Sequence, residues 1–356
     1  MPCYHPKIRV ENTSKWEKAL DGHRYHPATI YTPSQFGELE KVKSNINYNY
    51  QIIPCGNCIG CRLEYSREWA NRGYLESKLY DKNSNWFVTI TYDDEHLQKK
   101  EEIQTSDGFT YYHDENNGTL VPGDLTQFIK NIRQIMKRDY NQDGIRFMAC
   151  GEYGSEEYTE RPHYHIIFFN LNLPLEDLYN PRILGSYNEK NVYYQSHIIE
   201  RAWNKGISNV SNATWNTIAY TARYITKKIN GELSEHAYAE KGQDKEFFRV
   251  SRKPGIGEGY FKEHWKEIYK NDEITIHNKK GVVKCKPPKY FDKLLEKEHP
   301  KLYKEIKEKR KKAQKDNQTI LDETTSLDRL QQYCIDERSK LSHQQALVRE
   351  FESGRQ

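Results

Sequence analysis

The chain has 356 residues, which is enough for one large domain or two, and a net charge of +4. Its mean hydropathy is −1.00, and no apolar run approaches the ~20 residues that a membrane-spanning helix needs. The N-terminus lacks the basic and apolar layout of a secretory signal, so the seven cysteines favour reduced thiols or a metal site over disulfides. We therefore expect no membrane partner. A net charge of +4 is too small to indicate nucleic-acid binding by itself, so any such binding would depend on local clusters of basic residues.

A cysteine-rich segment follows residues 1–54, which have little periodicity and are expected to be irregular. Cys55, Cys58 and Cys61 are each separated by two residues, with glycines between them, so three thiolates can face one ion. A structural zinc takes four ligands, and Cys3 is our candidate for the fourth. The alternatives are an iron–sulfur cluster and a glycine-rich turn whose thiols bind no metal.

Hydrophobic periodicity predicts helices and strands between this segment and residue 140. The strand over residues 86–92 is the clearest of these elements, because its residues are apolar or β-branched throughout. The predicted elements are a helix over 63–79 with several basic residues, a strand over 86–92, a small hairpin at 109–112 within a polar insertion, and a helix that Asp124 or Thr126 caps and that continues to about residue 140.

A predicted β-hairpin, formed by residues 146–153 and 161–169, carries two histidines on its second strand. Residues two apart in a strand point to the same face, so His163 and His165 project side by side. Two neighbouring imidazoles can hold one metal ion. Alternatively, they are ordinary histidines at a sheet edge that hydrogen-bond to backbone groups.

An acidic residue on the facing strand completes a candidate metal site. An antiparallel register whose turn is centred near Glu157 places Glu152 opposite His163. Two imidazoles and a carboxylate suit Mn²⁺ or Mg²⁺ and leave open positions for a phosphate. Glu157 and Glu160 are alternatives for the third ligand, because the register is inferred from the turn alone.

A later helix carries two tyrosines and a lysine. Tyr220, Tyr224 and Lys227 fall at i, i+4 and i+7, so they share one helix face and offer two nucleophiles beside a cation. With 27 tyrosines in the chain, core packing is the alternative reading of this spacing. The elements predicted after residue 170 are a loop with a late strand over 192–199, a turn at 201–206, and a helix that begins at Thr214 or Asn216 and ends near residue 229, before Gly231.

The last third of the chain is basic and polar. Residues 249–259 form a glycine-rich loop whose amides, with Arg252 and Lys253, suit a phosphate backbone, although a flexible surface turn has the same composition. From about residue 261 charged residues dominate. The segment 301–316 is typical of a solvated helix, with a nucleic-acid arm or a partner helix as the alternatives.

Together these patterns predict an α+β fold, with an antiparallel sheet flanked by helices. The histidines are expected on a central strand and the tyrosines on a following helix. The predicted regions are an N-terminal segment with the cysteines over 1–62, a main domain over 63–262, and a charged, mostly helical extension over 263–356.

Four motifs in a fixed order resemble the HUH endonuclease superfamily of rolling-circle replication initiators, here with Tyr164 between the histidines. The closer resemblance is to the replication initiators of gokushovirus-type microviruses, small single-stranded DNA phages that also carry the cysteine–glycine segment and a Pro-Gly-Ile-Gly loop. It covers about residues 1–262. The motifs are Phe87-Val88-Thr89-Ile90-Thr91-Tyr92, Gly151-Glu152-Tyr153-Gly154, Arg161-Pro162-His163-Tyr164-His165, and Tyr220-x₃-Tyr224-x₂-Lys227.

The resemblance implies a metal-dependent endonuclease that nicks and rejoins single-stranded DNA at the viral origin. It implies that His163, His165 and Glu152 bind Mg²⁺ or Mn²⁺. Tyr220 or Tyr224 would form a 5′-phosphotyrosine and free a 3′-OH that primes rolling-circle replication.

The resemblance also implies partners and a place of action. Lys227 would stabilise charge that develops on the phosphate or the tyrosine. No Gly-x₄-Gly-Lys-Ser/Thr phosphate loop is present, so a host helicase would unwind the DNA, in the cytoplasm of a bacterial host. The basic residues that we expect to contact DNA are Arg62, Arg161, Lys228, Arg252 and Lys253.

Two other functions share some of these features. A non-catalytic zinc protein could bind single-stranded nucleic acid by stacking bases on its tyrosines. A related transposase or relaxase would use the same metal site on other DNA. The two-tyrosine helix favours an initiator over a single-tyrosine transposase, and the cysteine segment favours the phage family.

Overall fold

A computed structural model gives the coordinates of the chain. The chain divides into two compact units. The larger unit is Tyr65–Thr325 with Glu352–Gln356, and the smaller unit is Met1–Glu64 with Ser326–Phe351. The structure describes residues 3–19, 24–32, 48–112, 118–154, 161–184, 191–227, 232–278, 281–327 and 329–353.

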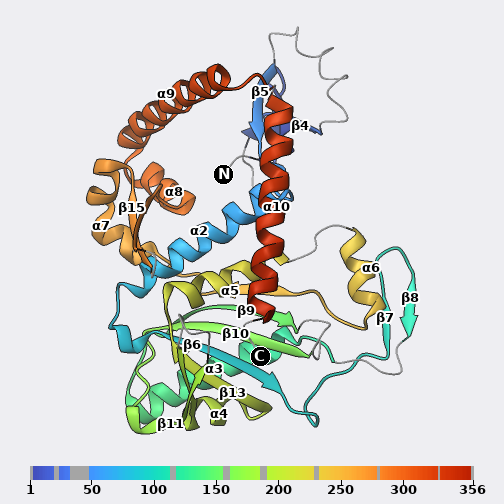
Figure 1. Cartoon of the computed structure of the whole chain (residues 1–356), viewed down its shortest axis with the longest axis vertical. Helices are drawn as coiled ribbons and strands as arrows, with labels where there is room; N and C mark the ends of the chain where they lie inside the picture. Colours follow the sequence, from blue (N-terminus) through green and yellow to red (C-terminus); the bar gives the residue numbers. More distant parts are fainter. Residues whose placement is uncertain are drawn as a thin grey trace. The chain divides into compact units, whose positions relative to one another are not determined.

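An antiparallel sheet with seven described strands is the centre of the larger unit (Figure 1). The strand with the two histidines, β10 (Pro162–Phe169), is interior and pairs with β9 (Arg146–Tyr153) on one side and β6 (Trp86–Tyr92) on the other. The α+β class with antiparallel sheets is therefore confirmed. In spatial order the strands are β11 (Leu178–Leu184), β12 (Asn191–Ser196), β13 (Gly206–Asn212), β6 (Trp86–Tyr92), β10 (Pro162–Phe169), β9 (Arg146–Tyr153) and β14 (Phe247–Val250).

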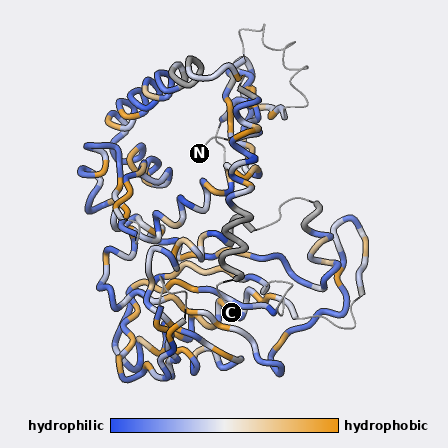
Figure 2. The backbone as a smooth tube through the Cα atoms, in the orientation of Figure 1, coloured by the Kyte–Doolittle hydropathy of each residue, from blue (hydrophilic) through white to orange (hydrophobic). Residues whose placement is uncertain are grey.

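The central strands β6, β9 and β10 are largely buried on both faces, and hydrophobic residues are concentrated along them (Figure 2). Val88 and Ile90 point to one face, where two helices cover them. Phe87 and Ile167 point to the other face, where they pack with Ile218. The first face is covered by α3 (Pro122–Tyr140) and α4 (His197–Trp203), and the second by α5 (Trp215–Lys227).

The helix predicted to end near residue 140 is α3, but its predicted caps are wrong. Its N-cap is Val121, with Pro122 at the first helical position, where a missing N–H costs nothing. Asp124 lies inside the first turn and accepts a hydrogen bond from the Tyr92 hydroxyl at 2.8 Å. Thr126 donates to the Pro122 carbonyl at 2.9 Å. Both side chains therefore have other partners.

The segment from 171 to 212 contains more regular structure than predicted. Strand β11 replaces part of the expected loop, and the late strand stops at Ser196 because the Ser196 hydroxyl caps α4, accepting from the Ile199 amide at 3.2 Å. The expected turn at 201–206 is largely the end of that helix. Strand β13 then begins at Gly206, where an added Cβ would lie 2.3 Å from the Thr91 carbonyl oxygen.

The charged C-terminal region shares a second hydrophobic core with the helix near the cysteines, within the larger unit. Phe261, Phe291 and Leu295 are fully buried there, together with Tyr74 and Leu75 from the helix near the cysteines. Because of this shared core, 263–325 cluster with 65–262 rather than apart from them. The division into three predicted regions stays a prediction.

The remaining elements of the larger unit surround this core and the sheet. The long basic helix is α9, whose colours in Figure 2 are mostly hydrophilic, as expected for a solvated helix. The elements are η2 (Lys82–Ser84), β7 (Glu102–Gln104), β8 (Thr110–Tyr112), η3 (Leu175–Asp177), α6 (Glu232–Glu240), α7 (Glu258–Asn271), β15 (Ile274–Asn278), β16 (Gly281–Cys285), α8 (Lys289–Glu298) and α9 (Pro300–Thr324).

The smaller unit contains strands where irregular structure was expected. A three-stranded antiparallel sheet has the order β4-β1-β5, and Lys7 pairs with Ile53 across a long stretch of sequence. Such pairing leaves little local periodicity. Its elements are β1 (Lys7–Asn12), β2 (Glu17–Lys18), β3 (Arg24–Tyr25), β4 (Ala28–Tyr31), β5 (Tyr48–Ile53), the first turns of α2 (Ile59–Ser77) and most of α10 (Arg329–Ser353).

Among the described residues, no helix has the length and apolar character needed to cross a lipid bilayer.

Candidate active site

The β9–β10 hairpin holds the two histidines and the acidic residue that were predicted to form a metal site. Glu152 lies opposite His163, and Cys150 lies opposite His165. The predicted register is therefore confirmed, and all four side chains belong to one face of the sheet. The alternative third ligands, Glu157 and Glu160, lie outside the described residues.

One carboxylate oxygen contacts both imidazoles. Oε1 of Glu152 lies 2.7 Å from Nε2 of His163 and 2.7 Å from Nε2 of His165. One ligand atom from each residue can be chosen so that all three lie within 4.8 Å of one another. Glu152 and His165 are buried, whereas His163 is partly exposed. Three donor atoms that converge in this way can bind a divalent ion and leave positions for substrate oxygens.

The hydrogen bonds behind the imidazoles indicate why a cation suits this cluster. Nδ1 of His163 lies 3.0 Å from the Arg161 carbonyl oxygen, and because a carbonyl only accepts, Nδ1 carries the hydrogen. A neutral imidazole then presents the Nε2 lone pair to the negative oxygen of Glu152. That contact is favourable only if the imidazole is protonated or a cation lies between the two atoms.

The carboxylate of Glu152 is charged and incompletely bonded. Burial acts to raise its pKa, but when the imidazoles are protonated and no metal is bound, the charge of His165 and the hydrogen bonds from both histidines outweigh burial and lower the pKa to about 2. Its second oxygen, Oε2, is buried and has no hydrogen-bond partner among the described residues. A buried anionic oxygen without a donor is costly, so the residues present fit a bound cation.

Two residues of β6 hold His165 in place, and the sequence alone did not identify them. Thr89 lies opposite His165, with its Oγ1 2.9 Å from Nδ1. The ring of Phe87 stacks on the imidazole at 5.4 Å between centroids. Strand alternation puts Phe87 and Thr89 on one face, but only the β6–β10 register brings them beside His165.

Helix α5 brings a tyrosine to this cluster. The ring of Tyr220 lies 5.2 Å from the His165 ring and 6.2 Å from Phe87, edge-on to both. The helix begins next to Thr214, one of the two predicted start residues, whose Oγ1 accepts from the Thr217 amide at 3.3 Å. Tyr224 and Lys227 also lie within α5, as predicted, but their side chains are outside the described part.

The predicted DNA-contact residues have different surroundings. Arg161 precedes β10 and is partly exposed; it donates to the Tyr92 carbonyl at 3.2 Å and forms an ion pair with Asp94. Arg62 lies in the first turns of α2 and is partly exposed. Lys228 lies outside the described residues.

The basic loop after β14 is more tightly held than its composition indicates. The Gly255 amide donates to Glu258 at 2.9 Å, and the Gly257 amide donates to Glu76 at 2.6 Å. These two amides therefore have carboxylate partners, and the expectation that the loop's amides suit a phosphate does not hold for them. The exposed basic residues of this loop are Arg252 and Lys253.

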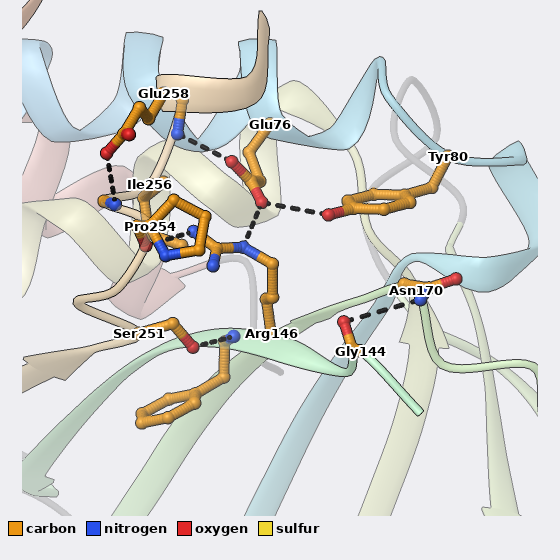
Figure 3. Close-up of polar contacts among 12 residues, drawn as sticks. Glu76, Tyr80, Gly144, Arg146, Asn170, Ser251, Pro254, Ile256 and Glu258 are labelled. Atoms are coloured by element: carbon orange, nitrogen blue, oxygen red, sulfur yellow. Dashed lines mark hydrogen bonds and ion pairs between the residues drawn. The ribbon is translucent and has the colours of Figure 1, made fainter. Parts of the chain in front are cut away.

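Glu76 connects this loop to the sheet (Figure 3). Its carboxylate forms an ion pair with Arg146 of β9 and accepts from the Tyr80 hydroxyl at 3.2 Å. Arg146 also donates to the Pro254 carbonyl at 2.8 Å. The side chains of Glu76 and Arg146 are 1% and 12% exposed. The loop is thus anchored to the strand that carries Glu152.

The four predicted cysteine ligands also come together, in the smaller unit. Cys3, Cys55, Cys58 and Cys61 form the second cluster of possible metal ligands among the described residues. None of these four cysteines forms a disulfide bond.

Comparison with known proteins identifies the family. Residues 85–229 match the family described as Replication-associated protein ORF2/G2P. The chain is also 36% identical to Replication-associated protein ORF2 of Spiroplasma virus 4 over 322 residues, which cover 88% of this chain and 87% of that protein. The chain belongs to the microvirus-type replication-associated proteins.

Two further replication-associated proteins are similar to the chain. Replication-associated protein VP4 of Bdellovibrio phage phiMH2K is 29% identical over 269 residues, covering 74% of each protein. Replication-associated protein ORF4 of Chlamydia phage 1 is 26% identical over 247 residues, covering 69% of this chain and 54% of that protein. No solved structure matches the chain significantly.

The family match has two consequences. Residues 85–229 extend from β6 to the end of α5, so they contain Glu152, both histidines and Tyr220. The similarity to the Spiroplasma virus 4 protein covers 88% of this chain, and residues 1–262 make up a smaller share of it. The similarity therefore extends beyond residue 262, where the sequence-based resemblance was expected to end. The family membership supports a role for this replication-associated protein in phage DNA replication.

Proposed function

We propose that this replication-associated protein is a metal-dependent endonuclease that nicks single-stranded DNA at the viral origin and rejoins strands through a tyrosine. The observation that carries the proposal is the 5.2 Å separation of the Tyr220 and His165 rings. It brings a phenol, which can act as a nucleophile, beside a cluster that fits a divalent ion. The role of the family in phage replication supports DNA as the substrate.

The proposed reaction transfers a phosphate ester from DNA to the protein. The phenol of Tyr220 or Tyr224 loses its proton, and its oxygen bonds to the phosphorus of a phosphodiester. The bond from phosphorus to the 3′ oxygen breaks, and that oxygen takes up a proton to become the 3′-OH that primes synthesis. The number of phosphate ester bonds is unchanged, so attack by a 3′-OH on the phosphotyrosine rejoins a strand without ATP.

His163, His165 and Glu152 would hold Mg²⁺ or Mn²⁺, which would supply positive charge at a phosphate oxygen when bound. The Arg161 carbonyl keeps the hydrogen on Nδ1 of His163, so that Nε2 offers its lone pair. The Thr89 hydroxyl holds the His165 ring through Nδ1. Both contacts orient ligand atoms before substrate arrives.

Basic groups and host proteins complete the proposal. Lys227 would stabilise the charge that develops during transfer. The chain lacks a Gly-x₄-Gly-Lys-Ser/Thr phosphate loop, and we assign unwinding to a host helicase in the bacterial cytoplasm. The proposed DNA contacts are Arg62, Arg161, Lys228, Arg252 and Lys253.

The test is to trap the covalent intermediate. The full chain is incubated with Mn²⁺ and single-stranded oligonucleotides that tile the viral genome, and adducts are mapped by mass spectrometry. We expect a phosphotyrosine at Tyr220 or Tyr224, and none with the variant Tyr220→Phe/Tyr224→Phe. His163→Ala should abolish the adduct while DNA binding remains. An adduct that persists in the double phenylalanine variant would exclude these nucleophiles, and binding without any adduct would support a stacking protein.

A further inference from the structure

Four cysteines of the smaller unit converge on one point. The sulfur atoms of Cys3, Cys55, Cys58 and Cys61 all lie within 4.8 Å of one another. The distance from Cys55 to Cys61 is 3.9 Å, and the distance from Cys3 to Cys58 is 3.9 Å. These distances far exceed a disulfide bond of about 2.05 Å. They are close to the separation of about 3.8 Å between sulfurs placed tetrahedrally around zinc at about 2.3 Å.

Backbone amides point at the sulfur atoms. The amide of Cys55 donates to Sγ of Cys3 at 3.1 Å, and the amide of Cys58 donates to Sγ of Cys55 at 3.3 Å. The amide of Tyr4 donates to Sγ of Cys58 at 3.4 Å. Such donors favour the thiolate form of a cysteine. Four adjacent thiolates repel one another unless a cation balances their charge.

We infer that Cys3, Cys55, Cys58 and Cys61 bind one structural zinc ion. Four protein ligands close the coordination sphere and leave no position for a substrate, which is the pattern of structural sites. An iron–sulfur cluster would divide the four thiolates among two or four irons and hold the sulfurs on different irons farther apart. The proposed zinc belongs to the smaller unit and does not depend on the proposed nicking chemistry of the larger one.

The site fastens the two ends of the chain within this unit. Cys3 is followed by Tyr4, whose ring lies edge-on to Tyr333 of α10 with centroids 6.2 Å apart. His5 then contacts the Glu337 carboxylate of the same helix at 2.8 Å. Tyr333 also packs against the apolar cluster around the cysteines. A zinc ion bound to Cys3 therefore fixes the position of Tyr4 and His5, which contact α10. Loss of the metal should weaken these contacts and release the helix.

The metal is tested first on the unaltered full chain. Elemental analysis of the purified protein should give one zinc per chain, and replacement by Co²⁺ should give the absorption bands of a tetrahedral thiolate site. The four cysteines should react with N-ethylmaleimide at least about tenfold more slowly than the exposed Cys334 until a chelator removes the metal. The proposal is overturned if the protein as purified, before any chelator is added, contains no metal and its four cysteines react as fast as Cys334, or if it contains iron in place of zinc.

A matched pair of variants tests the structural role. Cys58→Ser should lose the zinc and expose α10 to trypsin, with cleavage after Arg338 at least about tenfold faster. Cys334→Ser removes a thiol outside the cluster and should keep both the zinc and the protease resistance of the unaltered chain. A Cys58→Ser protein that retains one zinc contradicts the site. If Cys58→Ser does not fold, comparing trypsin cleavage of the unaltered chain before and after chelation decides the same point.

Discussion

Glu152 and His163 lie directly opposite each other on β9 and β10, with Oε1 of the carboxylate 2.7 Å from Nε2 of the imidazole. The same oxygen lies 2.7 Å from Nε2 of His165. A single buried oxygen thus contacts two imidazoles. In one of them, His163, the other nitrogen, Nδ1, donates to the Arg161 carbonyl. We therefore expect the identity of residue 152 to decide whether the cluster binds a cation.

Replacing Glu152 by glutamine should weaken metal binding while leaving the fold unchanged. The glutamine side chain has nearly the same shape but no charge, and its neutral amide oxygen is a weaker ligand for a divalent ion than a carboxylate oxygen. We expect the affinity for Mn²⁺, measured by calorimetry, to fall at least about tenfold, with loss of DNA nicking. Glu267→Gln, at an exposed carboxylate of α7, is the matched control and should change neither quantity. Unchanged Mn²⁺ affinity in the Glu152→Gln protein would remove this residue from the site.

The same carboxylate should make the metal-free protein sensitive to acid. The pKa of Glu152 is about 2 in the folded protein, below the ordinary value of 4.5, so the unfolded chain binds more protons between these values. The stability that this contact contributes is complete above about pH 4.5 and is lost as the pH falls towards 2. With a chelator present, the free energy of unfolding should fall more steeply in this range for the unaltered chain than for Glu152→Gln. Parallel curves would contradict the prediction.

Thr89 should affect the reaction although it is not itself a proposed ligand. Thr89→Val keeps the shape of the side chain but removes the hydroxyl that holds His165, so we expect nicking with limiting Mn²⁺ to fall about 10–100-fold. Thr89→Ser should restore most of the rate and the Mn²⁺ affinity. Thr275→Val, on the exposed side of β15, is the control for the loss of a strand hydroxyl. A Thr89→Val protein with full activity at low Mn²⁺ would show that the hydroxyl does not position the ligand.

Elements with strong local patterns were predictable from the sequence. Strand β6 is apolar and β-branched throughout and was predicted with its observed bounds, and α3 was predicted from its apolar stripe. The Glu152–His163 register also followed from the hairpin. In each case the signal lies within about twenty residues of the chain, where periodicity and turn length decide the structure.

Elements that depend on distant partners were not predictable. Strand β13 contains Ser208, Asn209 and Ser211, and this polar composition resembles a loop; its place in the sheet comes from pairing with β6. The three-stranded sheet of the smaller unit likewise pairs Lys7 with Ile53. The contact between Thr89 and His165 joins positions 76 apart. Such pairings leave no short-range periodicity for a sequence pattern to detect.

The buried ion pair of Glu76 and Arg146 should be important for stability rather than for catalysis. Glu76→Ala leaves the nearly buried Arg146 guanidinium and the Gly257 amide without their carboxylate partner, so we expect the free energy of unfolding to fall by about 3 kcal/mol. Glu273→Ala removes the partner of the exposed Lys284 and should cost less than about 1 kcal/mol. Urea unfolding followed by tryptophan fluorescence compares the two. Equal losses would mean that burial of the Glu76 pair does not determine its contribution, and the loop would then be held mainly by its other hydrogen bonds.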